Sequence, residues 1–160
     1  MKLSLHAVGR MKNGPERELF ARYFDRASAS GKQQGIHPII VKEYSESKAQ
    51  RGPDRKRQEG DEILSNIDAS SFVIALDERG KTLSSPDFAS LIGRARDDGA
   101  KEVVFVIGGA DGLDDAVRKR AQRTIAFGAM TWPHQIVRVL AAEQVYRAIS
   151  IMGNHPYHKI

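Results

Sequence analysis

The hydrophobic positions of the chain follow two patterns that alternate along its length. Residues 71–76 (SFVIAL) and 102–107 (EVVFVI) are apolar runs, which are typical of strands buried on both faces of a parallel sheet. Residues 15–30 instead place apolar side chains at three- and four-residue spacing, which predicts an amphipathic helix. Because strand and helix patterns alternate, we predict an α/β fold with a mainly parallel sheet. The other expected elements are strands at 2–8 and 36–41, a loop at 77–81, a helix from Pro86 to about 97 with Ser85 as its N-cap, a helix at 114–123, and a short strand plus loop at 124–130.

Residues 42–60 differ in character from the rest of the chain. They contain almost no large apolar side chain and many charged ones, so we expect a mobile loop or the start of a solvated helix that residues 61–67 complete. The basic cluster Arg51, Arg55, Lys56 and Arg57 is most simply a solvated charged face. The alternative is that these side chains contact the phosphates of a nucleic acid.

The last thirty residues predict a long helix followed by a polar tail. The helix starts at Pro133 and His134, since proline is tolerated in a first helical turn, and Gly153 and Asn154 can end it. Its apolar positions cover more than one side, which indicates packing against both its own sheet and a second subunit. These positions are Ile136, Val137, Val139, Leu140, Val145, Ile149 and Met152.

Composition narrows the class of protein. A length of 160 residues with 41% apolar and 28% charged residues predicts one globular domain, residues 1–160. We expect no membrane span and no signal peptide, because the chain has no apolar run of 18 residues and no cleavage pattern near its start. The absence of cysteine excludes thiolate metal sites and is compatible with the cytoplasm. A formal net charge of +5 permits an anionic partner such as RNA.

Three predicted strand ends are candidates for a ligand site, because open α/β sheets bind ligands beyond the carboxyl ends of their strands. They are Leu76, the segment 107–109 and the segment 127–132. Gly108 and Gly109 would let a ligand approach the backbone, although a tight strand-to-helix turn is the simpler explanation of the two glycines. The segment is neither a dinucleotide-binding G-x-G-x-x-G nor a phosphate-binding P-loop. Apolar walls and backbone donors suit an adenine ring.

The polar residues near the C-terminus could take part in chemistry. His155 and His158 straddle a proline with no carboxylate nearby, so we expect no zinc site and no other metal. Glu143 and Arg147 are four residues apart on the long helix, where they can form an ion pair or orient a substrate.

Several of these segments together resemble the RlmH family, the SPOUT-class methyltransferases of bacterial large-subunit ribosomal RNA. The resemblance covers essentially the whole chain. It rests on residues 106–113 (VIGGADGL), on the helix pattern of residues 133–148 with its Pro-His start and its Glu143, Tyr146 and Arg147, and on the tail Asn-His-Pro-Tyr-His at 154–158.

The resemblance implies a C-terminal trefoil knot, roughly within residues 70–160, that holds S-adenosylmethionine. It also implies a homodimer that methylates N3 of a pseudouridine in 23S rRNA on the assembled ribosome. The cofactor contacts implied by matching positions are Leu76, Gly108, Phe127, Gly128, Ala129, Met130, Thr131 and Trp132.

The chemistry of that reaction suggests roles for the tail. The methyl sulfonium is already electrophilic, so the protein must align the reactants and help the N3 proton leave. His155 or His158 could take that proton, Tyr157 could stack on the base, and Arg147 could hold a phosphate or carbonyl oxygen. The alternatives are a SPOUT methyltransferase of another RNA such as tRNA, a non-catalytic ribosome-binding factor, and a generic nucleotide-binding protein.

Overall fold

The sheet of this protein is parallel throughout the part of the chain that the structure, a computed structural model, describes, which is residues 1–159. Its strand order is β2-β1-β4-β3-β5, and each neighbouring pair runs in the same direction. The predicted α/β class is therefore confirmed. The strands are β1 Lys2–Val8, β2 Ile39–Tyr44, β3 Phe72–Thr82, β4 Glu102–Ile107 and β5 Arg123–Ala126.

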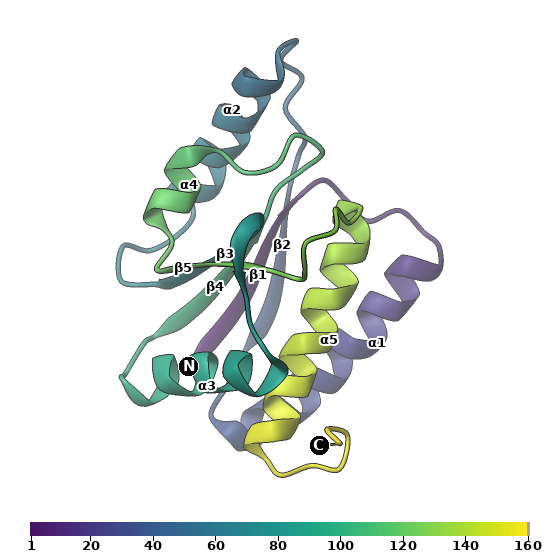
Figure 1. The fold of residues 1–160 in the computed structure, drawn as a ribbon, viewed down its shortest axis with the longest axis vertical. Coiled ribbons are helices and arrows are strands. Elements are labelled where there is room, and N and C mark those ends of the chain that lie inside the picture. The colour runs from purple at the N-terminus through teal and green to yellow at the C-terminus, as the bar shows by residue number, and fades with distance from the viewer. Residues whose placement is uncertain (160) are drawn as a thin grey trace.

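Helices cover both faces of the sheet (Figure 1). The helices α1 Pro15–Gly31, α3 Ser85–Asp97 and α5 His134–Met152 pack on one face, and α2 Gly52–Ser65 and α4 Asp115–Arg120 pack on the other. The alternation of β4 explains this arrangement, because Val103 and Phe105 enter the first core while Val104 and Val106 enter the second. Apolar runs without polar gaps were thus the correct signal for a sheet that is covered on both sides.

The predicted second strand was displaced by three residues. Pro38 has no N–H to donate to the ladder, so β2 begins only at Ile39. Ile36, expected to start the strand, is instead fully buried in the first core, and its N–H donates to the carbonyl of Gly31. The strand then continues to Tyr44, into the segment that was expected to be loop or helix.

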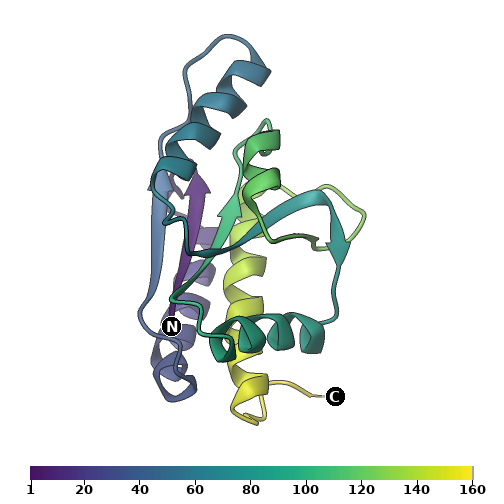
Figure 2. The same cartoon turned by 90° about the vertical axis from the view of Figure 1, so that its left-hand side faces the viewer.

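The predicted loop at 77–81 was wrong, because β3 continues through it to Thr82. The register against β5 shifts there, so that Leu76 and Lys81 both pair with Ile125. In Figure 2 this last part of β3 bends away from the sheet and descends to α3. Gly80 lies directly on β5, since a Cβ at this position would be 2.5 Å from the backbone nitrogen of Ile125. The charged residues 77–81 therefore belong to an extended strand that crosses β5, and they do not form a turn.

Three helix boundaries also differ from the expectations. The N-cap of α3 is Ser84, whose Oγ accepts from the N–H of Asp87 at 3.2 Å, and Ser85 is the first helical residue. The helix α2 starts at Gly52, so residues 52–60 of the charged segment are helical, whereas α4 ends at Arg120. The long helix α5 has the predicted extent, and Asn154 follows it with a positive φ of 51°. No helix within residues 1–159 is long and apolar enough to cross a membrane.

Candidate functional site

A cavity of about 480 Å³ lies at the carboxyl ends of β3, β4 and β5. This is where an open α/β sheet is expected to bind a ligand, and the volume lies in the range of small-molecule sites. All of the eight predicted cofactor contacts except Ala129 line it, and Ala129 is exposed. The residues that line the cavity include Leu76, Asp77, Glu78, Ile107, Gly108, Gly109, Asp111, Leu113, Arg118, Phe127, Gly128, Met130, Thr131, Trp132, His134 and Val137.

The loop after β4 requires glycine for steric reasons. A Cβ on Gly108 would lie 2.6 Å from the carbonyl carbon of Gly112, and a Cβ on Gly109 would lie 3.0 Å from Cγ1 of Val8. Gly112 itself has a φ of +84°, and its N–H donates to the carbonyl of Gly109 at 3.0 Å. The loop is therefore a tight turn, as the simpler explanation held, and it also exposes bare backbone to the cavity.

Two arginines on the second face of the sheet hold this loop. The guanidinium of Arg55 in α2 donates to Asp111 through both oxygens, with Nε–Oδ2 at 2.6 Å and Nη2–Oδ1 at 3.0 Å. The hydrogen bond from Arg55 lowers the pKa of the Asp111 carboxyl. In α4, Arg118 donates to the carbonyl of Leu113 at 2.7 Å and to Asp77 Oδ2 at 3.2 Å. The C-terminal end of the glycine turn, at Asp111 and Leu113, is thus fixed to two helices.

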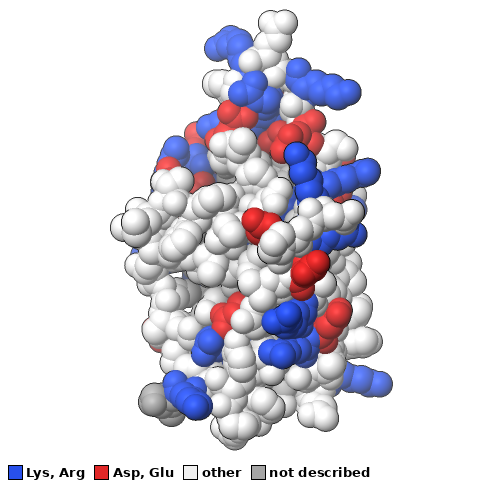
Figure 3. Space-filling model, turned by 90° about the vertical axis from the view of Figure 1, so that its right-hand side faces the viewer, with Lys and Arg blue, Asp and Glu red and all other residues white. Residues whose placement is uncertain are grey.

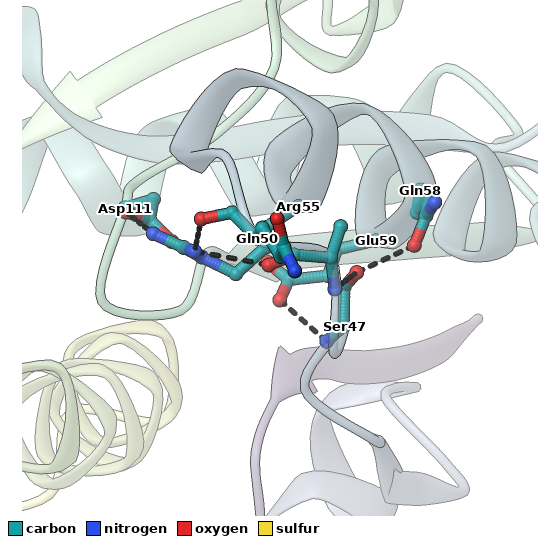
Figure 4. A network of polar contacts seen from close by, with 7 residues as sticks. Ser47, Gln50, Arg55, Gln58, Glu59 and Asp111 are labelled. Atoms are coloured by element: carbon teal, nitrogen blue, oxygen red, sulfur yellow. Dashed lines mark hydrogen bonds and ion pairs between the residues drawn. The ribbon is translucent and has the colours of Figure 1, made fainter.

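The segment before α2 is held by the same network (Figure 4). Nη1 of Arg55 donates to the carbonyl of Gln50 at 2.8 Å, and Glu59 Oε1 accepts from the N–H of Ser47 at 2.9 Å. The Glu59 side chain is buried beside the glycine turn, and this burial raises the pKa of its carboxyl. Arg55 is therefore a structural link to the cavity rather than a member of a solvated basic face.

The opposite wall of the cavity is the segment 127–132 between β5 and α5. The indole Nε1 of Trp132 donates to the carbonyl of Phe127 at 3.2 Å, which closes the segment into a loop. Gly128 has a φ of +107°, a conformation that side chains rarely adopt. Met130 and Trp132 remain 75% and 43% exposed, which is unusual for large apolar residues and leaves them free for a ligand or a partner.

The predicted catalytic residues form a separate cluster at the end of α5. Arg147 and Glu143 make the expected ion pair, with Nε–Oε1 at 2.9 Å, and the Tyr157 hydroxyl donates to the same carboxylate oxygen at 2.9 Å. The centre of the Tyr157 ring lies 4.6 Å from the centre of the Tyr146 ring and 4.8 Å from the guanidinium carbon of Arg147. Burial, followed by hydrogen bonding to neighbouring side chains, raises the pKa of Tyr157, so its hydroxyl stays protonated.

The two tail histidines differ in their surroundings. Nδ1 of His155 accepts from the N–H of Tyr157 at 3.2 Å, and the residue is exposed. Nδ1 of His158 is buried, and no hydrogen-bond partner lies near it within residues 1–159. In that same part of the chain, no group of three or more His, Cys, Asp or Glu residues is arranged to hold a metal ion.

The segment that leads into α5 and the C-terminal tail lie at opposite ends of this helix (Figure 1). His134, the first residue of α5, lines the cavity, whereas none of Arg147, His155, Tyr157 and His158 does. At about 1.5 Å per helical residue, Arg147 lies about 20 Å from His134 along the helix axis. One chain therefore does not bring its tail to its own cavity.

Sequence reasoning missed several residues that build the cavity. Asp77 directly follows the end of the apolar run 71–76, and this position could have suggested it. Arg55 and Asp111 are 56 residues apart and carry no shared motif, so no sequence signal linked them.

Comparison with known proteins agrees with this geometry. The family model described as "Predicted SPOUT methyltransferase" matches residues 1–158. Proteins named "Ribosomal RNA large subunit methyltransferase H" are similar over the full length: that of Rhizobium leguminosarum bv. trifolii is 49% identical over 160 residues, covering 100% of both chains. That of Brucella anthropi is 51% identical over 159 residues, covering 99% of each.

Among solved structures, one described as a probable methyltransferase from Bordetella pertussis Tohama I has the same fold. Its TM-score is 0.52 at 14% identity, covering 92% of this chain and 95% of that one. The family match and the full-length relatives confirm the resemblance found in the sequence. The chain belongs to the SPOUT methyltransferase family.

Proposed function

We propose that this protein transfers a methyl group from S-adenosylmethionine to N3 of a pseudouridine in 23S rRNA of the assembled ribosome. The observation that carries the proposal is the cavity at the ends of β3, β4 and β5, built on a glycine turn in a chain of the SPOUT family. Full-length relatives named as large-subunit rRNA methyltransferases support the choice of RNA. We further infer that residues 1–160 act as one methyltransferase domain in the cytoplasm.

The lining of the cavity suits this cofactor. Apolar side chains of Leu76, Ile107 and Val137 form walls for an adenine ring, and the bare backbone at Gly108 and Gly109 offers polar groups at close approach. When bound there, S-adenosylmethionine supplies an electrophilic methyl group. We assign its binding to the eight predicted residues, with Ala129 contributing only through its place in the loop: Leu76, Gly108, Phe127, Gly128, Ala129, Met130, Thr131 and Trp132.

We expect the chain to be knotted, as family membership implies. The close crossing of Gly80 over Ile125 supports this, because the end of β3 passes across β5 with backbone on backbone. Such threading would bring the segment 127–132 back beside the glycine turn, since both line the same cavity.

We also propose a homodimer in which the tail of one subunit serves the cavity of the other. The separation of the two along α5 requires this if the tail takes part in chemistry. Ile136 and Leu140 on α5 remain partly exposed, and Trp132 and Leu83 are exposed nearby, so an apolar surface is available for a second copy. Figure 3 shows an expanse of uncharged surface on the side that carries α1 and α5.

The tail residues can divide the work of the reaction. The raised pKa of Tyr157 makes it a hydrogen-bond donor or stacking partner rather than a base. We expect an imidazole of His155 or His158 to accept the N3 proton, because histidine is the side chain that most often acts as a general base. Arg147, held by Glu143, would position a phosphate or carbonyl oxygen of the target.

The test is transfer of labelled methyl from S-adenosylmethionine to ribosomes from cells that lack this protein, followed by mass-spectrometric mapping. Label on one 23S rRNA pseudouridine is the expected result. Label on tRNA or on protein-free RNA alone would overturn the ribosome as substrate. Binding to ribosomes with no transfer at all would instead favour a non-catalytic factor.

A further inference from the structure

A second groove, of about 720 Å³, lies beside the cofactor cavity and is lined by four cations. Arg79 and Lys81 come from the end of β3, Arg94 from α3, and Arg123 from the start of β5. All four side chains belong to exposed residues. None of these four positions is among the predicted cofactor contacts or the tail residues, so the groove needs an explanation of its own.

The four cations have no carboxylate partner within residues 1–159. The one side-chain hydrogen bond among them runs from Arg123 to the backbone carbonyl of Gln122 at 2.7 Å. Asp87 is the single acid that lines the groove, and its Oδ2 accepts from the Ser84 hydroxyl, so four cations face one acid and the groove is formally +3. Cations gathered without neutralising partners repel one another and attract a polyanion.

This pattern contrasts with that of the arginines that hold the fold and the cavity. Arg55, Arg118, Arg138 and Arg147 are all ion-paired and hold the fold or the cavity. Arg22 and Arg26 of α1 are also exposed and make no ion pair within residues 1–159, but they lie on the surface of one helix, whereas the groove gathers four such cations around one cavity. Guanidinium groups match phosphate oxygens in geometry, which favours a nucleic-acid backbone over a flat membrane or an apolar peptide.

The position of the groove indicates what its positive charge could bind. Arg79 and Ile125 line both the groove and the cofactor cavity, so the groove opens next to the cavity. We propose that this groove binds backbone phosphates of the RNA strand that flanks the target nucleotide. The inference rests on the proposed function and adds to it a recognition surface on the body of the subunit. Phosphate contacts of this kind fix register while the tail acts on the base.

The experiment compares two matched double variants. Arg94→Gln/Arg123→Gln removes two groove cations, and Arg79 is left unchanged because it also lines the cofactor cavity. Arg22→Gln/Arg26→Gln removes two exposed arginines of α1 that make no ion pair within residues 1–159. It lowers the net charge by the same amount as the groove variant. For each protein, methyl transfer to ribosomes is measured from about 50 to 200 mM salt, together with S-adenosylmethionine binding.

For the groove variant we expect the KM for ribosomes to rise on the order of tenfold near physiological salt, with kcat and cofactor affinity unchanged. The slope of log affinity against log salt should become shallower by roughly 0.7 per lost phosphate contact. The α1 variant should behave like the wild type. Lys81→Gln serves as a second, milder variant and should change the slope by about half as much.

Three results would count against the proposal. An unchanged KM and salt slope in the groove variant, with an active wild type, would overturn the groove as the RNA contact. An equal loss in the α1 variant would assign the effect to net charge and would overturn it as well. A wild type that methylates no ribosomes would overturn the proposed function first and this inference with it.

Discussion

Arg55 binds Asp111 through both carboxylate oxygens, and this contact joins the charged helix α2 to the glycine turn at the cofactor cavity. The same guanidinium donates to the backbone carbonyls of Ala49 and Gln50, so it also orders the segment before α2. Asp111 in turn lies in the segment that lines the cavity. A residue that lines no part of the cavity thereby fixes the backbone that does.

Arg55→Gln should weaken cofactor binding without unfolding the protein. Since both partners are partly exposed, we expect the Kd for S-adenosylmethionine to rise by roughly two- to fivefold. Arg57→Gln is the control, because Arg57 is paired with Asp54 on the outer side of the same helix and has no contact with the turn. Calorimetric titration of both variants decides the point. Equal affinities in the two would mean that the turn keeps its shape without Arg55.

Arg138 should be a stability residue. Its side chain is 1% exposed and donates to the carbonyls of Val8 and Gly9 and to Glu43 at 2.6, 2.5 and 2.6 Å. Replacement by Met leaves two buried carbonyls without a donor, so we expect a loss of about 3 kcal/mol in the free energy of unfolding. Urea denaturation measures it. Glu43→Gln keeps an acceptor for Arg138 and should cost clearly less, whereas equal losses would assign the effect to the charge pair alone.

His6 should make stability depend on pH. Nδ1 of this buried histidine lies 2.8 Å from the Tyr44 hydroxyl, and burial lowers the pKa of His6 to about 4. Between about pH 6.5 and 4 the unfolded chain binds a proton that the folded chain does not, so this contribution to stability is lost as the pH falls through that window. At pH 5 the loss amounts to about 2 kcal/mol relative to pH 7.

The comparison that isolates this effect is His6→Gln. Glutamine can still accept from Tyr44, whose own pKa is raised to about 12 by burial, so the hydroxyl remains a donor throughout. Thermal or urea unfolding at pH 7 and pH 5 should show a smaller pH dependence in the variant than in the wild type. Parallel curves would exclude His6 as the source of the acid sensitivity.

What the sequence could reveal depended on whether the signal was local. The apolar run of β4 gave its bounds without error, because a strand buried on both faces has no polar position to confuse the pattern. The end of β3 was missed because Asp77 to Lys81 carry charges, and only the crossing with Ile125 makes them a strand. The Arg55–Asp111 contact was invisible for the same reason, since it exists only once two distant segments meet. Local patterns thus located the cavity but not the residues that hold it.

We expect the active site to be divided between two subunits. A Cβ at Gly108 would lie only 2.6 Å from the backbone of Gly112, and Gly108→Val adds still more atoms there. The substitution should therefore abolish cofactor binding. The triple variant His155→Ala/Tyr157→Ala/His158→Ala removes the proposed chemistry of the tail and should keep cofactor binding, because none of these residues lines the cavity. Each variant alone should therefore be inactive in methyl transfer.

Co-expression of the two variants separates a shared site from a site within one chain. If the tail serves the partner's cavity, a mixed dimer holds one intact site, formed by the tail of the Gly108→Val subunit and the cavity of the tail variant. Random pairing then restores about a quarter of the wild-type activity. If each chain uses its own tail, no subunit in the mixture is intact and activity stays absent. The α5 helix holds cavity and tail about 20 Å apart along its axis, so we expect recovery, and its absence would overturn the proposed dimeric site.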